Sequence, residues 1–169
     1  MPEVEVAPEA VQGLAAAGHN FYTLQGAQSC WAQLQALTSG TVAVLTAGPA
    51  YKCPAAPYEA AMLIEAWLRK HKRTPAVRVQ VWAAEPAPMP VAGQAVSAAL
   101  VGMLTSKGID YAPGHQVLSV DPAQRRLYFA NGAQAGFDLL AYVPPHRAPA
   151  VLRSAGLCAV SGWLEADRH

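Results

Sequence analysis

The sequence predicts an α/β domain of Rossmann-like, three-layer architecture, with a central parallel sheet and a β-meander in place of the third crossover helix. Three features of the chain support this fold class. Residues 41–47 are apolar on both faces, which is typical of a buried parallel strand. Strand and helix patterns alternate over residues 41–104, and this order implies right-handed β-α-β crossovers. Residues 109–130 contain short strands joined by turns, which is the pattern of a meander.

The first half of the domain is predicted to contain two helices around one buried strand. A helix is expected over 27–37, because its apolar residues fall on one helical face until Ser39-Gly40 ends it. The buried strand 41–47 follows. A second helix is expected over 56–70, where a proline suits the first turn and apolar residues again recur at helical spacing.

The second half continues the alternation and then departs from it. Alternating valines predict a strand from Val77 that ends at Glu85, and a helix over 96–104 stops at Gly108. The expected meander has short strands and turn signals at 109–111, 116–120, 121–124, 126–130 and 131–132. The last strand, 137–143, is nearly all apolar, so we expect it to return to the buried parallel sheet.

Length and composition favour one domain that belongs to a larger protein. The 169 residues suit a single core, and residues 1–22 are rich in Pro, Ala and Gly without a sustained period. We therefore expect residues 1–22 to be a connecting segment that adds no core element and residues 23–167 to be the domain. Charged residues make up only 14% of the chain, which is consistent with a surface that faces another domain.

Charge, targeting signals and cysteine usage exclude several classes of function. A net charge of +1 gives no field that would attract nucleic acid, and the basic run 69–73 is expected to be a solvated helix end. The acidic start and the lack of a long apolar run predict a cytoplasmic protein without membrane contact by this chain, although a parent protein could be peripheral to a membrane. Three cysteines without metal-ligand spacing argue against a disulfide scaffold and a zinc site.

The turn after the first buried strand, residues 48–54, is where a Rossmann-like domain would hold a ligand. A dinucleotide needs the G-x-G-x-x-G pattern there, but this turn keeps only Gly48 and its prolines remove amide donors. Glu85 stands where an acid would bind a ribose, but without the glycines this is a weak signal. We therefore do not expect NAD(P) to bind.

The same turn carries a candidate reactive thiol, Cys53. Its place at a helix start beside Lys52 favours thiolate, the reactive species. The alternative, a small buried apolar residue, stays open from position alone. Cys30 and Cys158 are expected to be structural. His146 follows the last parallel strand and should therefore lie on the same sheet edge as Cys53.

Several stretches of the sequence resemble the sulfide:quinone oxidoreductase group, which includes the flavoprotein subunit of flavocytochrome c sulfide dehydrogenase. The similarity spans residues 17–167, and its most specific element is K-C-P-A-A-P-Y-E from Lys52. The other similar stretches are H-N-F-Y-T-L-Q-G-A from His19, G-I-D from Gly108, F-D-L-L-A-Y-V-P-P-H-R-A-P from Phe137, and S-A-G-L with G-W-L-E-A-D between Ser154 and Asp167.

The resemblance implies a two-domain FAD-dependent oxidoreductase, of which this chain is the second, NAD-like domain. It implies that FAD is bound mainly by a first domain that this chain lacks, and that Cys53 is a redox cysteine beside the flavin. That cysteine would pair with a partner cysteine beyond residue 169, and neither Cys30 nor Cys158 matches the partner position. Pro144 and Pro145 match a loop near the flavin. The implied partners are the rest of the parent flavoprotein, a sulfur-compound donor, and a quinone or cytochrome acceptor.

Two other functions stay open on the sequence. The domain could hold NAD(P)H in a flavoprotein similar to NADH dehydrogenases, or it could be a non-catalytic docking module that has the same fold, because fold does not determine function. The sequence does not identify the electron donor, the acceptor or the oligomeric state. The isolated chain is expected to be inactive.

Overall fold

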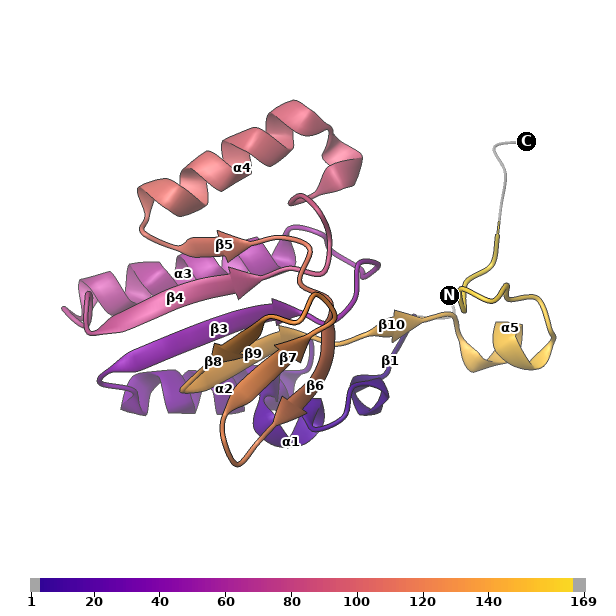
Figure 1. Cartoon of the computed structure of the whole chain (residues 1–169), viewed down its shortest axis with the longest axis horizontal. Helices are drawn as coiled ribbons and strands as arrows, with labels where there is room; N and C mark the ends of the chain where they lie inside the picture. The colour runs from indigo at the N-terminus through magenta and orange to yellow at the C-terminus, as the bar shows by residue number, and fades with distance from the viewer. Residues whose placement is uncertain (1–3, 166–169) are drawn as a thin grey trace.

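The structure is a computed structural model that describes residues 4–165, and a five-stranded parallel sheet lies at its centre (Figure 1). The strand order is β2-β9-β3-β4-β5, and every neighbouring pair is parallel. The strands are β2 (His19–Asn20), β3 (Gly40–Thr46), β4 (Val77–Trp82), β5 (Asp110–Ala112) and β9 (Leu139–Val143). The predicted strand 137–143 does return to this sheet, where it pairs with β3.

Three helices form the layer on one face of the sheet. They are α2 (Leu24–Ala36), α3 (Ala56–Lys70) and α4 (Gln94–Ser106). Val42 and Val44 of β3, together with the valines of β4, pack with Leu68 and Leu104 of α3 and α4 in one buried cluster. The first helix begins three residues earlier than predicted, because Thr23 caps it by accepting a hydrogen bond from the amide of Gly26 at 3.1 Å.

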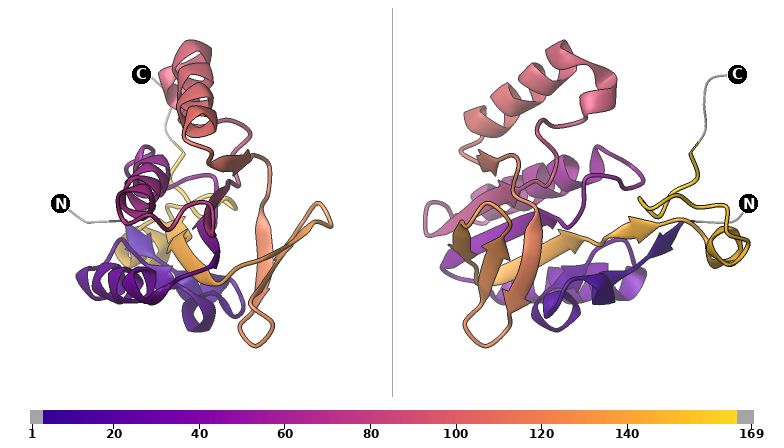
Figure 2. Two further views of the ribbon diagram at one scale, coloured as in Figure 1. Left: turned by 90° about the vertical axis from the view of Figure 1, so that its left-hand side faces the viewer. Right: turned by 45° about the vertical axis from the view of Figure 1, so that its right-hand side comes forward.

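The predicted β-meander covers the opposite face, as the left view of Figure 2 shows. It consists of β6 (Val117–Asp121), β7 (Arg126–Phe129) and β8 (Gln134–Gly136), which pair in antiparallel fashion. Leu127 and Phe129 of the meander pack on Ala43 and Leu45 of β3. The three layers are therefore helices, parallel sheet and meander, and the predicted fold class is confirmed.

The segment 1–22 contributes more to the described structure than a connection. Leu14, in the short helix α1 (Leu14–Ala17), is fully buried under the meander, and β2 forms an edge of the parallel sheet. The expectation that this segment adds no core element is wrong, because a two-residue strand and a one-turn helix are too short to show a period in the sequence. The domain boundary at residues 22 and 23 stays a prediction, and the expected domain end at Asp167 lies outside the described residues.

An arm of short elements extends beyond the carboxyl edge of the sheet (Figure 1). In this arm, strands β1 (Glu5–Val6) and β10 (His146–Arg147) pair in antiparallel fashion, a 3-10 turn lies at Pro8–Ala10, and α5 is Ala150–Ser154. A second 3-10 turn, Pro90–Ala92, directly precedes α4. The Glu5 carboxylate accepts hydrogen bonds from Arg147 at 3.1 Å and Arg153 at 2.5 Å. The amide of Ala150, followed by these guanidinium groups, lowers the pKa of Glu5.

Candidate functional site

Cys53 is exposed on the loop that joins β3 to α3, at the carboxyl edge of the parallel sheet. Its carbonyl accepts a hydrogen bond from the amide of Ala56, the first residue of α3, at 2.9 Å. Its backbone has a φ of 57°, in the left-handed region that a non-glycine residue rarely adopts. The structure thus places Cys53 beside a helix start, as the sequence predicts, and shows the residue to be exposed, which its position in the sequence had left open.

Tyr22, which precedes α2, is hydrogen-bonded to the backbone of this loop. Its hydroxyl donates to the carbonyl oxygen of Lys52 at 2.6 Å and lies 3.4 Å from that of Cys53. The Lys52 ammonium lies 5.9 Å from the centre of the Tyr22 ring. Burial, and then the neighbouring Cys53 and Glu85, raise the pKa of Tyr22, so its hydroxyl keeps the proton that it donates.

Glu85 follows β4 and is only 2% exposed. One of its carboxylate oxygens accepts hydrogen bonds from the hydroxyls of Tyr51 and Tyr58, the latter at 2.6 Å. Its other oxygen accepts from Thr46, the last residue of β3, at 2.7 Å. A buried carboxylate is stable only when its oxygens have such partners. These three hydroxyls already occupy both oxygens of the acid that a dinucleotide-binding domain would offer to a ribose.

Pro144, Pro145 and His146 lie at the same edge, directly after β9. His146 is 8% exposed, and its ring packs edge-on against Tyr22 with the centroids 5.5 Å apart. Its Nδ1 lies 2.8 Å from the carbonyl oxygen of Pro144, so Nδ1 carries the proton. Burial lowers the pKa of His146, and its Nε2 has no hydrogen-bond partner among the described residues.

The remaining sequence candidates lie elsewhere. Cys30 is buried on the core side of α2, where burial raises the pKa of its thiol to about 11. Cys158 is half-buried in the segment after α5. The basic run 69–73 is at the end of α3, as expected, where Arg69 pairs with Glu65 at 3.1 Å. Within residues 4–165, no group of three His, Cys, Asp or Glu side chains is placed to hold a metal ion.

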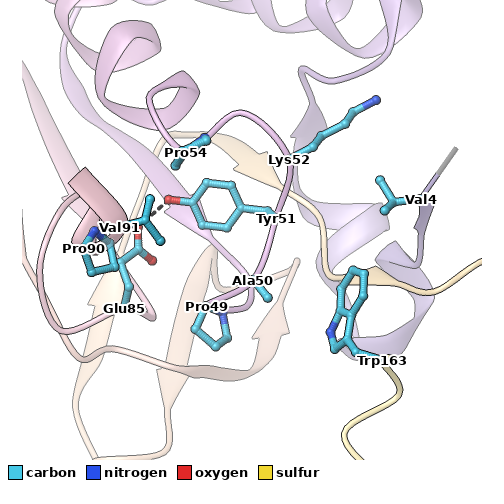
Figure 3. Close-up of a pocket in the computed structure, with 10 residues that line it drawn as sticks. All are labelled: Val4, Pro49, Ala50, Tyr51, Lys52, Pro54, Glu85, Pro90, Val91 and Trp163. Atoms are coloured by element: carbon cyan, nitrogen blue, oxygen red, sulfur yellow. Dashed lines mark hydrogen bonds between the residues drawn. The ribbon is translucent and has the colours of Figure 1, made fainter. Parts of the chain in front are cut away.

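A cavity of about 570 Å³ opens beside the Cys53 loop (Figure 3). The Tyr51 ring stands in it and points its hydroxyl at Glu85. Apart from Lys52 and Glu85, its lining is largely apolar or aromatic: Val4, Pro49, Ala50, Tyr51, Pro54, Pro90, Val91 and Trp163. The cavity is at the position where open α/β sheets bind ligands.

A protein family described as the central part of the flavoprotein chain of sulfide dehydrogenase (flavocytochrome c) matches residues 28–144. The chain belongs to this family. The match includes the Cys53 loop, Glu85 and the strand that leads to Pro144. The resemblance of the sequence to the flavocytochrome c and sulfide:quinone oxidoreductase group is therefore confirmed.

Solved structures share the fold of this sulfide dehydrogenase family domain. The sulfide:quinone oxidoreductase of Aquifex aeolicus is 20% identical with a TM-score of 0.75, and the match covers 94% of this chain and 39% of that one. The NAD-dependent persulfide reductase of A. fulgidus is 15% identical with a TM-score of 0.65, and the match covers 94% of this chain and 27% of that one. NDH2 of Plasmodium falciparum, solved in complex with NADH, is 11% identical with a TM-score of 0.67, and the match covers 86% of this chain and 33% of that one.

The chain spans less than half the length of these three proteins. No curated protein sequence gives a significant match. None of the helices in residues 4–165 is long and apolar enough to cross a lipid bilayer.

The sequence pattern did not reveal the tyrosines that surround the Cys53 loop. Tyr51 lies directly before the K-C-P-A-A-P-Y-E element and Tyr58 lies within it. A tyrosine on each side of Cys53, together with an acid at the end of the next strand, is the signal that could have identified them. Tyr22 had no such signal, because it lies 30 residues from the Lys52 carbonyl that it contacts.

Proposed function

We propose that this chain is a domain of an FAD-dependent oxidoreductase that passes electrons from a sulfur compound through Cys53 to flavin, and from there to a quinone or cytochrome. The observation that carries this proposal is the exposed thiol of Cys53 at the start of α3 in a chain of the sulfide dehydrogenase flavoprotein family. A helix start and a neighbouring lysine are the surroundings in which reactive cysteines occur. We also propose that the chain by itself is inactive, because the flavin would be held mainly by another domain.

We propose that the residues of this domain line one edge of a flavin and do not form a cradle for the whole cofactor. The β3–α3 loop has a single glycine and three nearby prolines, so it lacks the amides that bind a pyrophosphate. Cys53 is exposed, while Pro144 and Pro145 leave the sheet on the same edge. We propose that FAD is held mainly by another domain and that these three residues lie near it.

The chemistry assigned to Cys53 is a two-electron oxidation of sulfur. The sulfur of a Cys53 thiolate and a hydrosulfide ion join through a new S–S bond, and one proton and two electrons leave. Bound flavin supplies the two-electron acceptor. The backbone around Cys53, fixed by Ala56 and Tyr22, holds the thiol at the exposed edge during this step.

The role of Cys53 is tested in the flavoprotein that contains this domain. We expect Cys53→Ala to reduce the rate of sulfide oxidation by about a hundredfold or more while the flavin content stays the same, because the sulfur that forms the new bond is gone. Cys158→Ala is the matched control and should keep the rate. An unchanged rate in Cys53→Ala, with flavin intact, would show that the assigned role is wrong.

We further propose that this domain does not bind NAD(P). The Glu85 carboxylate already accepts hydrogen bonds from Thr46, Tyr51 and Tyr58, so a ribose hydroxyl would have to displace one of them. We expect a fluorescence titration of the chain with NADH or NADPH to give no saturable binding below about 1 mM. Saturable binding in the micromolar range would contradict this proposal and favour a flavoprotein that oxidises NADH.

A further inference from the structure

The Cys53 loop is held from two sides, at two adjacent residues. Tyr51 reaches inwards and donates its hydroxyl to Glu85. The carbonyl of the next residue, Lys52, accepts the Tyr22 hydroxyl at 2.6 Å. Two consecutive residues are therefore fixed by contacts that lie far from them in the sequence, and Cys53 comes directly after them.

Glu85 also joins the loop to the rigid parts of the domain. Its carboxylate accepts hydrogen bonds from Thr46 at the end of β3 and from Tyr58 in the first turn of α3, so it connects the elements on both sides of the loop. Tyr58 is 1% exposed, and Thr46 also accepts a hydrogen bond from the amide of Ala84 at 2.9 Å. The Tyr51 hydroxyl is thus anchored to a fully buried network and not to another mobile side chain.

Cys53 needs such anchors because its own conformation is unfavourable. A non-glycine residue in the left-handed region costs about 1–2 kcal/mol and persists only where the surrounding contacts fix it. The φ of Cys53 is 57°, so this residue has such a strained backbone. The anchored residues Tyr51 and Lys52 fix it on one side, and the hydrogen bond from the Ala56 amide fixes it on the other. Without the anchor at Tyr51, the loop can relax towards a more favourable backbone, and the thiol then leaves the helix start.

We infer that Glu85 is a positioning residue for Cys53: it binds the loop through the Tyr51 hydroxyl and so holds the thiol at the N-terminal end of α3. The acid at the end of the second strand, which would bind a ribose in a dinucleotide domain, here binds a side chain of the loop that replaced the glycine motif. This inference deepens the proposed function. It depends on that function only for the claim that the Cys53 thiol takes part in sulfur oxidation.

The test uses the rate of alkylation of Cys53 in the chain with Cys158→Ser. Cys30 reacts slowly at neutral pH because burial raises its pKa to about 11, so the observed rate belongs to Cys53. We expect Tyr51→Phe to lower this rate at pH 7 by about two- to fivefold, which is the factor that a helix N-terminus contributes. Glu85→Leu should lower it similarly, because it removes the oxygen that accepts the hydrogen bond from the Tyr51 hydroxyl.

Tyr58→Phe is the matched control, since it removes a hydroxyl from the same Glu85 oxygen but lies in α3 and not in the loop. It should lower the melting temperature and leave the Cys53 rate unchanged. Tyr22→Phe releases the loop at Lys52 and not at Glu85, and it should also lower the rate, because the loop then loses its other anchor.

Two outcomes would overturn the inference. One is an alkylation rate in Tyr51→Phe equal to that of the parent chain, and the other is an equal loss of rate in Tyr51→Phe and Tyr58→Phe, which would indicate a general loss of structure. Alkylation needs neither flavin nor sulfide. A Cys53→Ala flavoprotein that still oxidises sulfide would therefore refute the proposed function and leave this inference intact.

Discussion

Replacing Gly13 by alanine is expected to destabilise the domain by about 2–5 kcal/mol, a large fraction of the roughly 5–15 kcal/mol that holds a typical domain together. A β-carbon at this position would lie 1.9 Å from the carbonyl oxygen of Val120, and the φ of Gly13 is +79°. The amide of Val120 donates to the carbonyl of Gln12 at 2.8 Å, so any movement that relieves the clash weakens this hydrogen bond. Urea unfolding followed by circular dichroism measures the loss.

Gly132→Ala is the matched control for this prediction. Gly132 has a φ of +82°, close to that of Gly13, but no atom lies within 4 Å of the position that a β-carbon would take there. Its loss of stability should therefore contain only the backbone strain, about 1–2 kcal/mol. If the two variants lose the same free energy of unfolding, the close approach of Gly13 to the Val120 carbonyl does not add to the loss, and the prediction is wrong.

The parts of the fold that the sequence predicted are those with long, regular patterns. The helix over 56–70 was predicted with the bounds that α3 has, because its apolar face continues for four turns. Strand β3 was predicted within one residue at each end, because it is apolar on both faces. Strands β1, β2 and β10 have two residues each and are held by their neighbours in space, so no local pattern could indicate them.

The candidate site was predicted in part for the same reason. Because β3, β4 and β9 run parallel, Cys53, Glu85 and His146 lie at one sheet edge, and the alternation of strand and helix patterns in the sequence predicts this parallel direction. The sequence pattern does not predict the direction in which side chains of irregular loops point. Tyr51 points inwards to Glu85 although it belongs to a surface loop, and Tyr22 reaches the loop from a segment that was expected to be a connection. Such contacts depend on tertiary packing and have no local signal.

Glu85→Leu is expected to lower the free energy of unfolding by about 3–6 kcal/mol, because it leaves the hydroxyls of Tyr51, Tyr58 and Thr46 without their acceptor. A buried hydroxyl that loses its partner costs about 1–3 kcal/mol, and Tyr58 and Thr46 have no access to water that could replace it. Leucine is similar in size to glutamate, so a cavity contributes little. Urea unfolding again gives the difference.

A second set of substitutions tests whether unpaired hydroxyls cause this loss of stability, because it removes the hydroxyls that Glu85→Leu leaves without an acceptor. Replacing both partners of a buried hydrogen bond by apolar groups is much less costly than removing one of them. The variant Glu85→Leu/Tyr51→Phe/Tyr58→Phe should therefore be more stable than Glu85→Leu alone, by about 2 kcal/mol or more. Thr46 is kept in this variant, because its oxygen also accepts from the amide of Ala84. If the triple variant recovers no stability, the loss in Glu85→Leu arises from altered packing and not from unpaired hydroxyls.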